Sequence, residues 1–524
     1  MIQRASPAPT TYKVPERSGE LLIDPPVERL PAILGQAMRR GWGRAEILGA
    51  PLGEFREKVR SRALSIAGRS VPADALTSAS RLVVMGHQPV FFHAGVWFKF
   101  FLLTRLHERL GMSGLYLLVD HDATGPITAE VPSRGDQLTR HTEALLDLPG
   151  DVPLEVAPVP TEGQWQTFCG RVRHHLDTLP AAEMRTCFET FVAGAAQART
   201  HASTLGQFLA AARRIYEATA APPRYAEVAV SSLSDTPEFA AFALHLLQNP
   251  AGFRQLYNAS LDEYRRLHRL RSAANPFPNL DEADGYEEAP FWILRGGRRV
   301  SLFVHRDGDR LKLRTSADAL LDLPVGPAGV DALRASGVRI RPKALTLTMF
   351  ARLCLGDLFI HGVGGGRYDR ATDVVIGEVF GCAPPPYVVA TATLMLPLAG
   401  TGAVVEDGRA LERRLMELQH NPERSLASPS EAQRRLIDQK WSLIRAVEQM
   451  RPGPERRAAT HRIREINTQL AQGLTDEIHR LQAKRATLGR SSAAVAAATY
   501  RGYPFFLFDP ACLSALAGGS TSAA

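Results

Sequence analysis

A polar turn between an apolar run and a helical run constrains the fold of this chain more than any other feature. The apolar run is Leu82–Met85, the turn covers Gly86–Gly95, and residues with helical spacing follow over Val96–Leu110. A buried strand, a polar turn and then a helix is how open α/β sheets build their ligand sites. The sequence therefore predicts an α/β fold with a site directly after a core strand.

The side chains of this turn suit proton transfer and ligand binding. We expect His87 and His93 to be catalytic, as general acid–base groups or metal ligands; turn residues that only hold the loop are the alternative. We expect Gln88 and Gly95 to bind substrate at the helix N-terminus, where free N–H groups favour an anion. The turn is not a phosphate-binding loop, because it matches neither G-x-G-x-x-G nor G-x-x-x-x-G-K-[ST].

Two further polar turns follow predicted strands. Asp120–Asp122 comes after the strand Ser113–Val119, and a glycine turn over Gly362–Gly366 comes after the strand Leu358–His361. The carboxyl ends of neighbouring parallel strands meet at one crevice. We therefore expect the three turns to form a single site.

The second turn supplies two carboxylates and an imidazole. Alternation along an extended strand end would point Asp120 and Asp122 in one direction. We expect both to be catalytic, as a general base, as amine-binding groups or as ligands of a divalent metal, with His121 contacting the substrate. An aspartate that only caps the next helix is the alternative.

The glycine turn and the basic residues around it suit an anion. Successive free N–H groups can cradle an anion, and an arginine can add a bidentate clamp. The expected substrate-binding residues here are Gly365, Gly366, Arg367, Tyr368 and, from a positive cluster upstream, Arg341. A tight turn with solvated arginines is the alternative.

A chain of 524 residues is long enough for several domains. We expect an N-terminal tail with short helices (1–80), a first core part with an insertion (81–235), a helical segment with a small β-meander (236–335), a second core part (336–405), a helical coiled coil (406–490) and a C-terminal tail segment (491–524). Apolar stripes at spacings of three and four lie on either side of residues 452–454. They predict an antiparallel helical hairpin that could pair with a second copy.

Composition limits the compartment and the partners. Five cysteines without a C-x-x-C pair indicate a reducing, cytoplasmic location and argue against a four-cysteine zinc site. Residues 406–490 hold 17 Lys and Arg against 12 Asp and Glu, a net of +5. No basic–aromatic motif accompanies this charge, so we expect a solvated face and no nucleic-acid binding. The uncharged run Tyr387–Val405 contains Pro397, Gly400 and Gly402, which favours a strand and loop over a membrane span.

The order of these motifs resembles the bacillithiol synthase family, the cysteine-adding enzymes of bacillithiol biosynthesis. The matching segments are Gly86–Gly95, Asp120–Asp122, Arg341-Pro342, Gly364–Tyr368, Pro384–Tyr387 and the coiled coil. The resemblance implies a Rossmann-like nucleotidyltransferase-type core with inserted connecting domains and a homodimer formed through a C-terminal antiparallel coiled coil. It also implies a nucleotide such as ATP or ADP at the first turn. The implied activity is that of a ligase or transferase joining a cysteine- or amine-type small molecule to another metabolite.

This sequence departs from the family at two positions. His87 stands where the family has Gln, and Arg367 stands where it has an acidic residue. The second departure implies an anionic substrate group in place of an amine. Two other functions remain open. One is a metal-dependent hydrolase that uses His87, His93 and Asp120–Asp122, and the other is a catalytically silent dimeric scaffold that binds a nucleotide.

Overall fold

A six-stranded sheet forms the centre of the body, in the order β1-β16-β15-β4-β5-β8. Its strands are β1 (Leu21–Asp24), β4 (Leu82–His87), β5 (Ser113–Leu118), β8 (Tyr225–Ala229), β15 (Leu358–His361) and β16 (Tyr387–Ala392). β1 is an antiparallel edge strand, whereas the other five run parallel. The structure is a computed structural model that describes residues 12–67, 81–270, 272, 275–398, 402–450 and 453–519. The predicted α/β class is confirmed.

The chain reverses its direction of travel across the sheet beside β4. It runs outward from β4 through β5 to β8 and then returns to the other side of β4, where β15 and β16 lie. Leu358 pairs with Val83 across this junction. Open parallel sheets bind ligands at the carboxyl ends of their strands, where the strand order reverses. The turns after β4 and β15 lie at this position.

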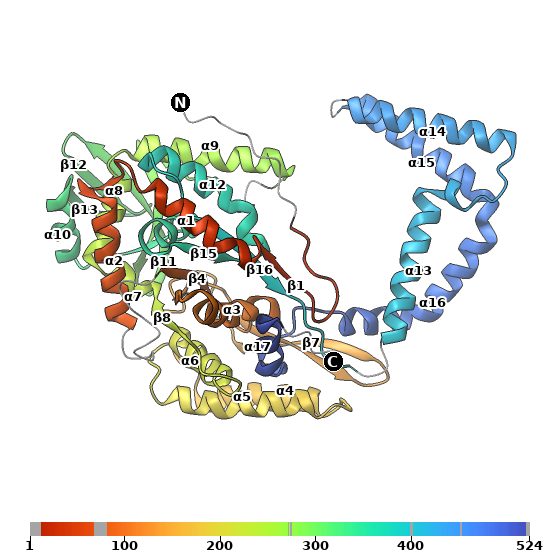
Figure 1. Cartoon of the computed structure of the whole chain (residues 1–524), viewed down its shortest axis with the longest axis horizontal. Coiled ribbons are helices and arrows are strands. Elements are labelled where there is room, and N and C mark those ends of the chain that lie inside the picture. The colour runs from red at the N-terminus through yellow and green to blue at the C-terminus, as the bar shows by residue number, and fades with distance from the viewer. Residues whose placement is uncertain are drawn as a thin grey trace.

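Helices cover both faces of the sheet, and alternate residues of each strand enter two separate hydrophobic cores (Figure 1). Val83 and Met85 share a core with α3 (Ala94–Leu110), α4 (Glu162–Leu176), α5 (Glu183–Arg199), α6 (Leu205–Glu217) and α17 (Pro510–Gly518). Leu82 and Val84 share the other core with α2 (Leu52–Ala67), α8 (Pro237–Leu246), α9 (Pro250–His268), α11 (Ala344–Phe350) and α12 (Val363–Phe380). Burial on both faces explains why these strands are continuous apolar runs in the sequence. Shorter helices are η1 (Val27–Arg29), α1 (Leu30–Arg40), α7 (Val230–Ser234), α10 (Pro327–Ala335) and η2 (Ala351–Leu355).

Antiparallel strands form smaller sheets beside the main one. The predicted meander is present and is larger than expected, with β9 (Glu282–Ala283), β10 (Tyr286–Arg295), β11 (Arg298–Asp307), β12 (Arg310–Arg314), β13 (Ala319–Pro324) and β14 (Arg339–Pro342). The sequence pattern does not indicate the hairpin of β6 (Ile127–Arg134) and β7 (Leu138–Leu146), because most positions of β7 are polar and at least partly exposed. The remaining pair is β2 (Glu46–Ile47) with β3 (Ala50–Pro51).

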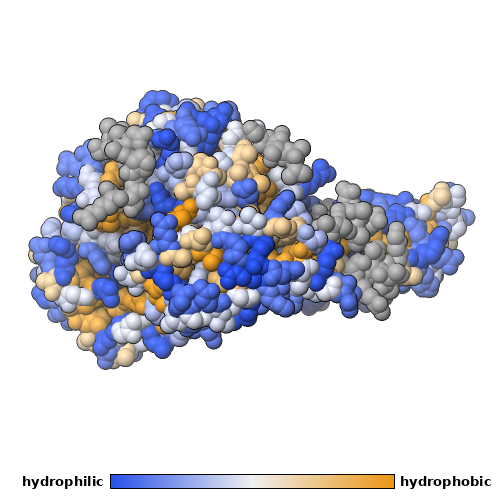
Figure 2. All heavy atoms as spheres, turned by 90° about the horizontal axis from the view of Figure 1, so that it is seen from below, coloured by the Kyte–Doolittle hydropathy of each residue, from blue (hydrophilic) through white to orange (hydrophobic). Residues whose placement is uncertain are grey.

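Four helices form an arm that projects from the body (Figure 1). They are α13 (Gly402–His420), α14 (Glu431–Gln449), α15 (Pro454–Ala471) and α16 (Thr475–Ala498), joined by η3 (Pro422–Ser425) and η4 (Gln472–Leu474). α13 packs against α16, and α14 packs against α15 in the predicted hairpin. On the face shown in Figure 2, the arm carries mostly hydrophilic residues. Of the helices in the described ranges, none combines the length and apolar character needed to cross a membrane.

The segment after the arm returns to the body and is not a tail, which corrects the expectation for residues 491–524. Here η5 (Phe505–Leu507) and α17 follow α16, and Phe505 donates its backbone N–H to the carbonyl of Phe92 at 2.8 Å. The ring of Phe506 lies 5.1 Å from that of Phe91 and 5.0 Å from that of Phe191. These buried rings make the segment part of the core under the first polar turn.

Candidate functional site

A cleft of about 550 Å³ lies at the carboxyl ends of β4, β5 and β15, and all three predicted turns line it. From those turns it receives His87, Gln88, His93, Gly95, His121, Asp122, Gly364, Gly365 and Tyr368. The meander adds Trp292 and Arg299, while Lys99, His361, Thr391 and Arg501 complete the polar lining. The structure thus brings the third turn, more than 200 positions away in the sequence, together with the first two.

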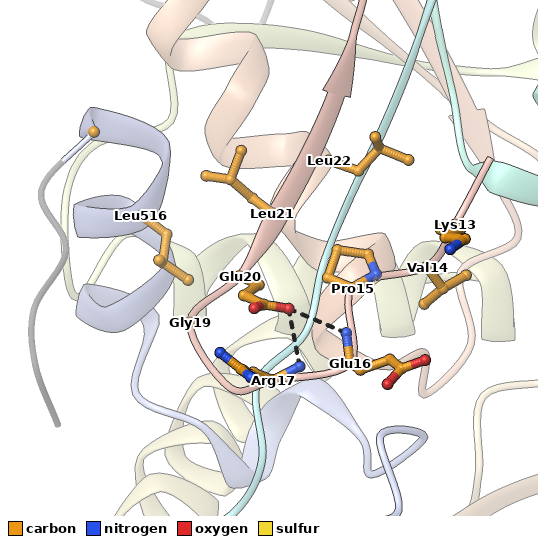
Figure 3. A pocket seen from close by; sticks show the side chains of 11 residues that line it. Lys13, Val14, Pro15, Glu16, Arg17, Gly19, Glu20, Leu21, Leu22 and Leu516 are labelled. Atoms are coloured by element: carbon orange, nitrogen blue, oxygen red, sulfur yellow. Dashed lines mark hydrogen bonds between the residues drawn. The ribbon is translucent and has the colours of Figure 1, made fainter. Parts of the chain in front are cut away.

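A larger hollow of about 800 Å³ lies between residues 13–22 and α17. Figure 3 shows that Glu20, its central carboxylate, accepts hydrogen bonds from the backbone N–H groups of Glu16 and Arg17. That carboxylate is therefore occupied in closing a turn of its own segment. None of the predicted site residues lines this hollow, so we place the candidate site in the cleft.

His87, at the end of β4, presents an unprotonated nitrogen. Its Nδ1 lies 2.9 Å from the carbonyl oxygen of Gln88, which can only accept, so Nδ1 carries the proton and Nε2 a lone pair. Burial and, to a smaller extent, the Lys99 ammonium together lower the pKa of His87 to about 3. The imidazole is therefore neutral at pH 7 and able to accept a proton.

His93 has the opposite tautomer. It caps α3, and its Nδ1 accepts the backbone N–H of Gly95 at 3.0 Å, so the proton of the neutral ring lies on Nε2. Burial lowers the pKa of His93 to about 4, with further contributions from Arg501 and Lys99. The cleft is therefore lined by one imidazole that accepts a hydrogen bond and one that donates.

The two aspartates of the second turn have different positions. Asp122 lines the cleft, forms an ion pair with Arg299, and accepts a hydrogen bond from Gln88 Nε2 at 2.7 Å. Asp120 lies outside the cleft, where it is buried and accepts hydrogen bonds from the N–H and hydroxyl of Ser231 at the start of α7. Burial raises the pKa of Asp120 to about 6. Asp120 thus binds the start of α7, 111 residues away, and not the next helix in the chain, α4.

His121 lines the cleft with one nitrogen free. Its Nε2 lies 3.1 Å from the Pro342 carbonyl, so this nitrogen donates and Nδ1 carries a lone pair. Nδ1 is buried and has no hydrogen-bond partner. Burial lowers the pKa of His121 to about 4. His121 thus holds a second unprotonated nitrogen beside the cleft, in a buried position.

Three of the expected substrate-binding residues do not line the cleft. Arg341 is buried and bonds to Glu155 at 2.8 Å and to Asp235 at 2.7 Å, which fixes the strand that carries Pro342. Gly366 is buried against β16, where any side chain would overlap Val389. Arg367 is exposed and donates to the carbonyl of Tyr12 at 3.2 Å. The charge reversal at Arg367 therefore does not face the cleft.

The predicted glycine turn is the first turn of a helix, which corrects the expectation of a loop. α12 begins at Val363 and includes three of the four glycines, while Gly362 is its N-cap. Glycine is needed here for close approach, because a Cβ on Gly365 would lie 2.5 Å from Nδ1 of His361. The backbone N–H groups of a first helical turn have no partner within the helix and remain available to an anion.

The sequence analysis missed a buried network behind the third turn. His361 Nε2 lies 2.6 Å from Asp369 Oδ2, which also accepts from Arg352 Nη1 at 2.7 Å. Burial alone would raise the pKa of Asp369, but the neighbouring Arg352 and His361 hold it at about 2. A histidine at a strand end with an aspartate eight residues later, inside the following helix, is the signal that could have found it.

Four other lining residues carry no local sequence signal. Lys99 lies in the middle of α3, and Trp292 and Arg299 come from the meander. Arg501 comes from the segment that returns after the arm. Only the tertiary fold brings these side chains to the cleft.

Comparison with known proteins assigns neither a family nor a function to this chain. No protein-family model matches the chain, and no curated protein matches it. Within the described ranges, no three His, Cys, Asp or Glu side chains are grouped so that they could hold a metal ion. The chemistry of the cleft must therefore be argued from its own residues.

Proposed function

We propose that this chain is a ligase or transferase that joins a cysteine- or amine-type small molecule to another metabolite in the cleft. The pair of neutral imidazoles with opposite tautomers carries the proposal. Such a condensation requires a base that removes a proton from the thiol or amine and a donor that stabilises the oxygen that becomes negative. His87 Nε2 suits the first role, and His93 Nε2–H suits the second.

Charged side chains in the cleft suit the two substrates. Asp122 is the carboxylate that lines it, and this group can bind an ammonium. Lys99 and Arg501 supply positive charge near His93, as their effects on its pKa indicate. The second substrate would therefore carry an anionic group, such as a carboxylate or the phosphates of a nucleotide.

The proposal includes a more specific assignment within this class of ligases and transferases, to a bacillithiol-synthase-like enzyme. The reversal of strand order beside β4 supports a Rossmann-like, nucleotidyltransferase-type core, with ATP or ADP as the candidate nucleotide. The arm supports a coiled coil that joins two copies, since α14 and α15 carry the apolar stripes. Of the two residues that differ from the bacillithiol synthase pattern, His87 lines the cleft, whereas Arg367 does not.

A thermal-shift screen with nucleotides, cysteine, amino sugars and divalent metals tests the proposal, because a ligand that binds only the folded state raises Tm. We expect pairs of hits to form a condensation product detectable by mass spectrometry. His87→Gln should lower product formation by about 100-fold, in the range for loss of a general base. His461→Gln, on the exposed surface of α15, is the control.

Equal rates for wild type and His87→Gln would contradict the proposal, and ligand binding without any product would favour the scaffold. The hydrolase receives no support from the geometry. Asp120 is bonded to Ser231, and Nε2 of His121 is bonded to Pro342, so these groups do not converge with His87.

A further inference from the structure

Lys99 is a buried lysine whose amino group has no partner among the residues that the structure describes. It lies in α3, is 3% exposed, and lines the cleft. In the part of the chain that the structure describes, its Nζ makes neither a hydrogen bond nor an ion pair. A buried ammonium without a counter-ion is costly, so such a site favours the neutral amine. The lysine therefore has an electrostatic reason to lose its proton.

Two other lysines with little exposed side chain show the contrast. Lys343 pairs with Glu288 at 2.6 Å, and Lys440 pairs with Glu423 at 2.8 Å. Each carboxylate stabilises the ammonium beside it. No such carboxylate pairs with Lys99 in the described ranges. Its positive charge instead lowers the pKa values of two imidazoles, His87 and His93. Burial lowers the pKa of Lys99 itself to about 8.

Arg501 supplies the neighbouring positive charge and is available to a carboxylate. It lines the same cleft and donates to Thr391 Oγ1 and the Ala392 carbonyl at 3.4 and 3.3 Å. No carboxylate in the described ranges pairs with it. A Cβ on Gly95 would lie 2.9 Å from Arg501 Nη2, so the glycine keeps the guanidinium close to the start of α3.

We propose that Lys99 is a nucleophilic amine that captures a small anionic carbonyl compound, an aldehyde or a 2-oxo acid, as an imine. The cleft offers both a buried amine without a counter-ion in the described ranges and a guanidinium for the carboxylate of such a compound. Desolvation by burial is an established way to activate a lysine. This site goes beyond the proposed condensation, and its test requires no turnover.

The chemistry balances without an added oxidant or reductant. The amine lone pair attacks the carbonyl carbon and forms a C–N bond, while His93 Nε2–H stabilises the oxygen that becomes negative. A first proton passes from nitrogen to oxygen with His87 Nε2 as the intermediate acceptor and gives the carbinolamine, and the remaining N–H proton then passes to the hydroxyl oxygen. The C–O bond then breaks, water leaves, and the imine remains; one amine and one carbonyl give one imine and one water.

Reductive trapping tests the proposal on the full chain. The protein would be incubated with glyoxylate and cyanoborohydride at pH 8, and each lysine followed by peptide mass spectrometry. Lys58 is the internal control because its side chain is exposed. We expect Lys99 to be modified at least about tenfold faster than Lys58, because at this pH far more of a low-pKa lysine is unprotonated.

Two variants and a second probe compound distinguish the role of Lys99 as the nucleophile from that of Arg501 as the carboxylate-binding group. Lys99→Met should abolish the fast modification, and Arg501→Gln should slow modification by glyoxylate but not by propanal, which has no carboxylate. Modification of Lys99 no faster than Lys58 in the wild-type protein would overturn the proposal. Saturable binding of inorganic phosphate without any trapped adduct would also overturn it, because Lys99 would then act only as a charge.

Discussion

His361 Nε2 lies 2.6 Å from Asp369 Oδ2, and Arg352 Nη1 donates to the same oxygen from 2.7 Å. Asp369 lies in α12 and is fully buried. One carboxylate thus orients an imidazole of the cleft and neutralises a buried guanidinium. Removal of the Asp369 carboxylate should therefore affect both His361 and Arg352.

We expect Asp369→Asn to lower the free energy of unfolding by about 3 kcal/mol, because the substitution leaves Arg352 with less negative charge in a buried site. Urea denaturation at pH 7 measures this change. Asp373→Asn is the control, because Asp373 also pairs with Arg352 but is partly exposed, and it should cost less. The pKa of Asp369 is lowered to about 2 from 3.8, so the ionised form stabilises the fold above pH 4. The difference between the variant and the wild type should shrink as the pH falls from 4 towards 2.

The contribution of Asp120 to stability should change with pH in the opposite direction to that of Asp369. Its pKa is raised from 3.8 to about 6, so the folded state binds a proton that the unfolded state has lost. We expect wild-type stability to fall, relative to Asp120→Asn, as the pH rises from about 4 to about 6. An asparagine can still accept the Ser231 N–H, whereas Asp120→Ala removes the acceptor and should cost about 1–2 kcal/mol. A stability difference between wild type and Asp120→Asn that does not change over this pH range would contradict the assignment.

His87 and His93 should both be neutral at pH 7 and should differ in tautomer. Nitrogen-15 NMR of histidine-labelled protein should find the proton on Nδ1 of His87 and on Nε2 of His93. Their pKa values are lowered to about 3 and about 4, whereas an unfolded histidine titrates near 6.5. Stability should therefore decrease as the pH falls from 6.5 to 4, and less so in His87→Gln and His93→Gln. The same tautomer at both positions would remove the basis of the acid–base pair.

Gly95→Ala should disrupt the start of α3. The added Cβ would lie 2.5 Å from Thr391 Oγ1 and 2.7 Å from the Ala392 carbonyl, both on β16. Overpacking of this kind costs about 1–3 kcal/mol, measurable by thermal or urea unfolding. Gly364→Ala provides a matched control in the same cleft, because nothing lies within 4 Å of its Cβ position. Equal stability of the two variants would show that β16 can move away at no cost.

Local patterns in the sequence predicted the strands and the polar turns well. Leu82–Met85 is apolar because both faces of β4 are buried, and His93 starts a helix because its side chain caps one. Convergence of the turns also followed from a general rule about parallel sheets. These patterns therefore predict where in the fold the site lies.

Side-chain direction and distant partners could not be predicted in the same way. Alternation placed Asp120 beside Asp122, but a bond to Ser231, 111 residues away, holds Asp120 outside the cleft. Arg501 lies in a segment with no local motif, and nothing in its neighbours indicates the cleft. Lys99 resembles any helical lysine until the packing around α3 is known.

The return of the chain after the arm has a consequence for biosynthesis. Phe505 and Phe506 pack beneath the first polar turn, where Phe506 covers Phe91, yet they are synthesised only after the whole arm. The ring of Phe91 stays partly uncovered while the whole arm is being made. A chain that ends prematurely at any point up to residue 504 would therefore have an open aromatic core beside the candidate site.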